Sequence, residues 1–130
     1  MLGGSEKITM DLVQLALNVS SLKQQVISNN IANSNTVGYK PLKVDFDKQL
    51  QNLSVTLSNR TDPNSVSSMI KTLQPQVVVD KELDQLGDKN VRLDQEMANM
   101  TENAVHYQAL IESVTKKMSL LRLAINGGQR

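Results

Sequence analysis

The chain has 130 residues, with no Cys, no Trp, one Phe and two Tyr, and its charges nearly cancel at a net +1. This length accommodates one domain with one core, which must be built from aliphatic side chains and six Met. A disulfide framework and a thiolate metal site are excluded because there is no Cys. No basic field is large enough to hold a nucleic-acid backbone, so we expect no nucleic-acid partner.

The N-terminal third predicts a long helix that begins near residues 5–8 and ends near residue 33. Its first ten residues lack a basic segment followed by an apolar one, and no apolar run approaches a membrane span of about 20 residues. We therefore expect a soluble chain without a cleaved signal peptide. The apolar positions step by three and four, which defines an N-terminal seam at Leu12, Leu15, Val19, Leu22 and Val26.

The middle of the chain is different in composition. Asn, Gly and a Lys-Pro step over residues 34–42 predict a turn, and residues 43–58 carry the stripe of a shorter helix that Phe46 begins. Residues 59–75 are polar and contain two of the three prolines, which predicts a mobile loop. Residues 76–80 (QVVVD) are β-branched and predict one short strand, and no second strand of similar strength is visible to pair with it.

The C-terminal third carries the strongest pattern and predicts a helix over about 94–126. Asp94 would cap its start, Glu96 would add negative charge to the first turn, and Gly127-Gly128 would end it. Ten apolar or aromatic residues step by four and three without a miss, as in a coiled coil. This C-terminal seam consists of Leu93, Met97, Met100, Ala104, Tyr107, Ile111, Val114, Met118, Leu121 and Ile125.

The predicted fold is mainly α. Two long terminal helices, each with one narrow seam, need partners, and the nearest partner of each is the other. We therefore expect an antiparallel coiled-coil-like pair, formed by a discontinuous helical core of residues 5–34 and 90–126. Residues 35–89 would be an insert with the short helix, the loop and the strand.

No group of residues indicates catalysis. The one histidine, His106, has only Glu102 one turn earlier, which is an ordinary surface pair. The acidic residues from 80 to 88 fail the calcium-loop pattern, because Gln85 and Val91 occupy the positions of its Gly and Glu. We therefore predict no enzyme activity, no cofactor, no metal and no small-molecule substrate. Cations without acids in the last fifteen residues suit a helix C-terminus or an anionic partner.

The segment SNNIANSNTVGYK, residues 28–40, crowds Asn residues at a predicted helix end and adds a rare aromatic. Its chemistry fits a helix stop and a contact site equally well. The segment also resembles the N-terminal signature of the bacterial flagellar axial proteins of the rod and hook. The matching signature residues are Asn29, Asn30, Ile31, Ala32, Asn33, Thr36, Gly38, Tyr39 and Lys40.

The C-terminal third resembles one branch of that family, the proximal-rod FlgB type. The resemblance lies in an N-V entry at Asn90, an E-N pair at Glu102, the run Y-Q-A-L at 107–110 and the K-K and L-R pairs that follow. Arg92 departs from the pattern, since an acidic residue is commoner there. The chain is also too short for the large outer domains of hook and distal-rod proteins.

The resemblance implies a structural subunit of the flagellar basal-body rod in the cell envelope, needed for flagellar assembly and motility. It implies export through the flagellar type III apparatus, self-association, and contact with other rod proteins and the membrane-ring adaptor. We expect the assembly interface at the N-terminal seam together with Met100, Tyr107, Ile111, Val114, Met118 and Leu121. The alternative is a soluble helical binding module, such as a flagellar export chaperone or adaptor.

Overall fold

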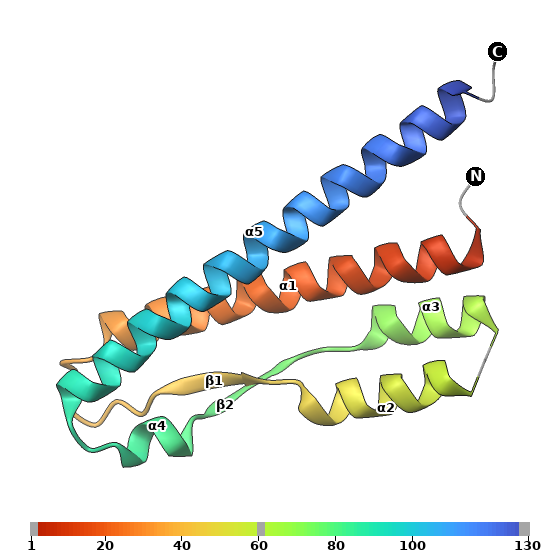
Figure 1. The fold of residues 1–130 in the computed structure, drawn as a ribbon. Helices are drawn as coiled ribbons and strands as arrows, with labels where there is room; N and C mark the ends of the chain where they lie inside the picture. The colour runs from red at the N-terminus through yellow and green to blue at the C-terminus, as the bar shows by residue number, and fades with distance from the viewer. Residues whose placement is uncertain (1–2, 60–61, 128–130) are drawn as a thin grey trace.

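The computed structural model describes residues 3–59 and 62–127. Helix α1, Gly4–Ala32, runs against helix α5, Lys89–Gly127, in the opposite direction, and shorter elements lie along α1 on the other side (Figure 1). The prediction of a mainly helical fold with two long antiparallel terminal helices is therefore confirmed. Within the described residues, neither helix is long and apolar enough to span a membrane.

Helix α5 begins five residues before the predicted start at residue 94. The carboxylate of Asp88 accepts hydrogen bonds from the backbone N–H groups of Asn90 at 2.8 Å and Val91 at 3.3 Å, which is the geometry of an N-cap. The prediction that Asp94 caps the helix is wrong, because this residue lies in the second turn. At 1.5 Å per residue, the 39 residues of α5 extend about 58 Å. Gly128, part of the predicted stop, lies outside the described residues.

The predicted strand over 76–80 pairs with residues that the sequence predicted to lie at the end of the turn over 34–42 and in the helix over 43–58. Strand β1, Leu42–Asp45, pairs antiparallel with strand β2, Gln76–Val79, in a register that places Leu42 opposite Val79. Burial alternates along β1, as expected for a strand with one covered face. The shorter helix α2 consequently occupies Asp47–Ser58, with Phe46 at its start, rather than 43–58.

The predicted loop over 59–75 is largely a helix, which corrects that prediction. Helix α3 spans Pro63–Thr72 and begins at a proline, whose fixed φ and missing N–H suit the first helical turn. Val66 and Ile70, one turn apart, are both buried. Residues 60–61 lie outside the described part of the chain.

The apolar core lies between the first half of α1 and the hairpin of α2 and α3, not between α1 and α5. Its fully buried members come from all three helices, and each stabilises the fold by about 1.5–3 kcal/mol. The Ser67 hydroxyl of α3 also donates a hydrogen bond to Asp11 of α1. The buried core residues are Leu15, Phe46, Leu53, Val66 and Ile70, and Ile8, Leu12, Val19, Met69 and Leu73 pack around them.

Among the acidic residues from 80 to 88, Asp80 and Asp88 cap helices and Asp84 makes an ion pair. Helix α4, Lys81–Gln85, is capped by the carboxylate of Asp80, which accepts from the backbone N–H of Leu83 at 3.0 Å. Asp84 lies 4.0 Å from the guanidinium of Arg92, and Gly87 takes a φ of 71° in the turn that follows. These contacts connect β2 to the start of α5.

Candidate assembly surfaces

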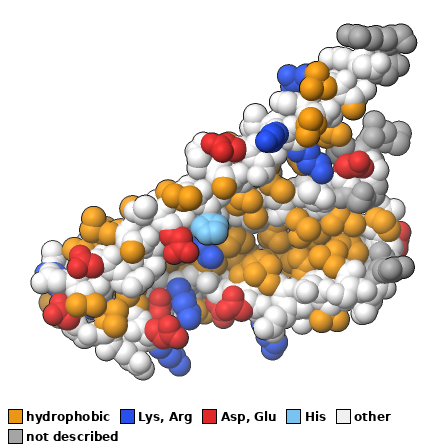
Figure 2. All heavy atoms as spheres, in the orientation of Figure 1, with side chains coloured by type: hydrophobic (Ala, Val, Ile, Leu, Met, Phe, Trp, Pro, Cys, Tyr) orange, Lys and Arg blue, Asp and Glu red, His pale blue; other side chains and the backbone are white. Residues whose placement is uncertain are grey.

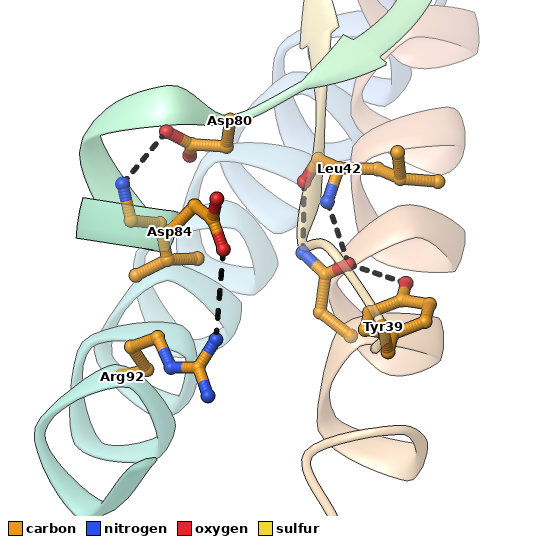
Figure 3. Close-up of polar contacts among 7 residues, drawn as sticks. Tyr39, Leu42, Asp80, Asp84 and Arg92 are labelled. Atoms are coloured by element: carbon orange, nitrogen blue, oxygen red, sulfur yellow. Dashed lines mark hydrogen bonds and ion pairs between the residues drawn. The ribbon is translucent and has the colours of Figure 1, made fainter. Parts of the chain in front are cut away.

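The signature segment forms a polar cluster that joins α1, β1 and α5. The amide nitrogen of Asn30 donates to the backbone oxygen of Leu42 and to the carboxylate of Glu96, each at 2.8 Å. The amide oxygen of Asn30 accepts from the Tyr39 hydroxyl at 2.8 Å and from the Leu42 N–H at 2.9 Å (Figure 3). Asn30 is buried and makes four hydrogen bonds, so it holds the start of the insert against both terminal helices.

The remaining signature residues build the turn between α1 and β1. The Asn33 amide donates to the backbone oxygen of Asn29 at 2.9 Å, and the Thr36 hydroxyl donates to the Asn33 side chain at 3.2 Å. Gly38 has a φ of 79°, a left-handed conformation that is costly for a residue with a Cβ. The segment therefore ends α1 and forms the turn that follows it. The same segment also makes a contact within the subunit, to α5.

Two charged or ionisable groups belong to this cluster. Glu96 is buried and accepts from Asn30 and, at 3.1 Å, from the Asn99 amide. Burial raises the pKa of the Tyr39 hydroxyl; the hydrogen bond from Asn29 lowers this pKa, and the charge of Glu96 raises it. The role predicted for Glu96, a charge in the first turn of α5, is wrong because α5 begins seven residues earlier at Lys89; the Glu96 carboxylate instead accepts a hydrogen bond from Asn30 of α1.

Farther along the helix pair, a second buried polar residue lies between α1 and α5. Asn103 donates to the backbone oxygen of Ser20 at 2.8 Å and to the Gln24 side chain at 2.9 Å. Glu96 and Asn103 are seven residues apart and therefore share one face of α5. That spacing is the sequence signal for this polar face, and a pattern of apolar residues alone does not contain it.

The C-terminal seam is only partly covered. Met100, Val114 and Leu121 are half-buried, whereas Tyr107, Ile111 and Met118 are exposed to 40%, 36% and 46%. We call Tyr107, Ile111, Met118 and Ile125 the outer stripe, since all four are exposed and share one face of α5. Between 36% and 59% of the surface of each of these residues stays open to water.

The N-terminal seam lies within the subunit. Leu15 and Val26 are buried, and Leu12, Val19 and Leu22 are half-buried. Leu12, Leu15 and Val19 belong to the core with α2 and α3. The N-terminal seam is therefore covered on the side of α2 and α3, whereas three of the C-terminal seam residues expected at the interface, Tyr107, Ile111 and Met118, remain exposed.

A groove of about 550 Å³ opens beside α1. Residues of α1 from Leu12 to Ile27 line it on one side, β1 and the start of α2 on another, and α5 on a third. Figure 2 shows apolar side chains gathered in this hollow, with the single histidine at its edge. That histidine, His106, lies 4.0 Å from Glu102, and both side chains are largely exposed. Among residues 3–59 and 62–127, no cluster of His, Asp and Glu is placed to hold a metal.

Comparison with known proteins gives the family. The family described as flagella basal body rod protein matches residues 13–40, which cover most of α1 and the signature turn. The flagellar basal body rod protein FlgB of Bacillus subtilis is 33% identical over 123 residues, covering 93% of this chain and 95% of that protein. The FlgB proteins of Buchnera aphidicola and Aeromonas hydrophila are 27% and 30% identical, with coverage of 88% and 89% of this chain and 91% of each relative.

The chain belongs to the FlgB family of flagellar basal body rod proteins. It is therefore a structural component of the rod and not an enzyme, which agrees with the interpretation of His106 as a surface residue. The resemblance noted at residues 28–40 falls at the end of the segment that the family matches.

Proposed function

We propose that this rod subunit assembles by packing the outer stripe of α5 against helices of neighbouring subunits, and that this packing is needed for flagellar assembly and motility. The observation that carries the proposal is the exposure of Tyr107, Ile111, Met118 and Ile125 on one face. Full burial of a large apolar side chain stabilises by about 1.5–3 kcal/mol, and a helix–helix contact would gain the fraction of this that the exposed part of each residue represents. Residues four and seven apart give the spacing that a partner helix accepts.

The residues expected at the assembly interface have two different roles under this proposal. Leu12, Leu15 and Val19 pack against α2 and α3 within the subunit, and they also line the groove beside α1. The contact to neighbours is assigned to the part of the C-terminal seam that remains exposed. Tyr107, Ile111 and Met118 would therefore contact the neighbouring subunit directly. The half-buried residues Met100, Val114 and Leu121 would flank this contact.

We also propose which parts of the chain enter the rod and which partners it meets there, as membership of the family implies. Residues 5–34 and 90–126 would form the unit that enters the rod wall, and residues 35–89 would brace α1. Support for the brace comes from the packing of α2 and α3 on α1. The partners would be other rod proteins and the membrane-ring adaptor, with delivery by the flagellar type III export apparatus.

The test compares two substitutions of the same kind on opposite faces of α5. Ile111→Asp introduces a charge into the outer stripe, and Val105→Asp introduces one at a residue that is exposed to 64% on the other side. We expect Ile111→Asp to abolish incorporation into purified basal bodies and swimming in soft agar. Val105→Asp should retain both.

Circular dichroism of the purified variants checks that each remains helical. Normal swimming and normal basal bodies with Ile111→Asp would overturn the proposal. Equal loss with both substitutions would show that the face of α5 does not matter, which would also contradict it.

A further inference from the structure

We infer that the groove beside α1 receives the outer stripe of α5 from a second copy of this chain. This inference rests on the proposed function, since it names the surface that the outer stripe contacts. Eleven of the twenty residues that line the groove are apolar; ten of them come from α1, β1 and the start of α2, and the eleventh is Leu110 of α5. Such a groove accepts the apolar face of an amphipathic helix through anchors at helical spacing.

The lengths of the two surfaces agree. The part of α1 that lines the groove runs from Leu12 to Ile27, which is about 22 Å at 1.5 Å per residue. The outer stripe runs from Tyr107 to Ile125, which is about 27 Å on the same scale. A single helix laid along the groove would therefore place most of its stripe on the apolar surface.

The charges also agree. Three carboxylates line the groove, Asp80, Glu96 and Glu102, against two lysines, Lys23 and Lys43. Residues 107–127 of α5 carry Lys116, Lys117 and Arg122 against the single acid Glu112, which is a net +2. At 3.6 residues per turn, Lys117 and Arg122 fall on opposite sides of the outer stripe. A docked stripe thus brings a cation toward each wall of the groove, where Asp80 and Glu102 lie on different elements.

The groove and the stripe are different surfaces of one chain. A contact between two different surfaces is heterologous, so each added copy leaves one groove and one stripe unoccupied. Such a contact grows into a helical array unless its rotation closes a ring. The geometry is that of a subunit that adds to the end of a filament rather than one that stops at a dimer.

The absence of cysteine from the sequence makes disulfide trapping a clean test. Groove variants Lys23→Cys and Leu50→Cys are each mixed with stripe variants Ile111→Cys, Met118→Cys and Ile125→Cys, all as full-length chains. Leu50 and Met118 are exposed to 47% and 46%, so these substitutions leave the core intact. Matched controls are Val55→Cys on α2 outside the groove and Leu123→Cys on the other side of α5.

Oxidation is followed on non-reducing gels, in the concentrated purified protein and in basal bodies from cells that make both variants. We expect at least one groove–stripe pair to exceed its matched controls by about tenfold, because docking raises the effective concentration of the two thiols. The inference is overturned if no pair exceeds its controls in either setting. It is also overturned if stripe–stripe pairs dominate, or if the groove cysteine is trapped by a different rod protein.

The two proposals fail in distinguishable ways. Loss of swimming in Ile111→Asp without a groove–stripe disulfide would leave the stripe as an assembly surface and remove the groove as its partner. Normal swimming in Ile111→Asp would instead remove the stripe itself.

Discussion

The first half of α1 packs apolar side chains against α2 and α3, whereas α5 turns buried Glu96 and Asn103 toward α1 and leaves its outer stripe exposed. The apolar contact closes a core inside the subunit. The polar contact fixes where α5 lies, since each buried polar group must meet its partner. The difference indicates that α2 and α3 of the same chain cover one side of α1, whereas the outer stripe of α5 is left for a neighbouring subunit.

The largest expected effect is on the apolar core between α1, α2 and α3. Phe46→Ala removes a buried ring from the core and should lower the free energy of unfolding by about 3–5 kcal/mol. Urea denaturation followed by circular dichroism measures the change. Val55→Ala, on the exposed side of α2, should cost less than about 0.5 kcal/mol. A loss below about 1 kcal/mol for Phe46→Ala would show that the core does not carry the fold.

The second largest expected effect is on the polar contact between Asn30 of α1 and Glu96 of α5. Asn30→Asp places a second carboxylate against Glu96 and removes a donor, and should cost about 3 kcal/mol at pH 7.5. Because like charges raise the pKa of one carboxyl in the folded state, the unfolded state binds fewer protons at neutral pH. The cost relative to the wild type should therefore shrink as the pH falls toward 4.5. Urea unfolding of both proteins at the two pH values measures it, and an unchanged cost would contradict the assigned contact.

The smallest effect tests the edge of the same cluster. The raised pKa of Tyr39 means that the folded chain keeps a proton which the unfolded chain loses near pH 10. Stability should therefore fall as the pH rises above about 10, and Tyr39→Phe should remove part of that fall. Tyr107→Phe is the control, since it leaves the cluster intact. The midpoints of urea unfolding at pH 9 and pH 11 measure the loss of stability for each variant. An equal loss for Tyr39→Phe and Tyr107→Phe would contradict the predicted role of Tyr39.

The long helices and the strand over 76–80 were predictable because each rests on a strong local pattern. Helix α3 was not predicted because polar Ser and Asn residues interrupt its apolar stripe, which has only two buried apolar residues, Val66 and Ile70. Strand β1 was missed because four residues do not distinguish a period of two from one of 3.6. The overlooked cap at Asp88 lies only six residues before the predicted one at Asp94.

The polar cluster could not be derived from the sequence in the same way. Asn30 and Glu96 are 66 residues apart, and nothing local indicates that they meet. The apolar periodicity of α5 pointed to a seam facing α1, yet the structure places amide and carboxylate groups there. The apolar residues of the predicted seam do line up along α5. Which of them are exposed depends on how α5 packs on α1, and a local sequence pattern does not determine that packing.

The most direct test of this account is amide hydrogen exchange of the chain alone and within assembled rods. In the isolated chain, amides of α1 residues 8–27 and of α2 and α3 should be protected together, because they share the apolar core. Amides of α5 from about residue 111 onward should exchange much faster and become protected in the rod. Equal protection of both regions in a proven monomer, or no gain in α5 upon assembly, would contradict the account.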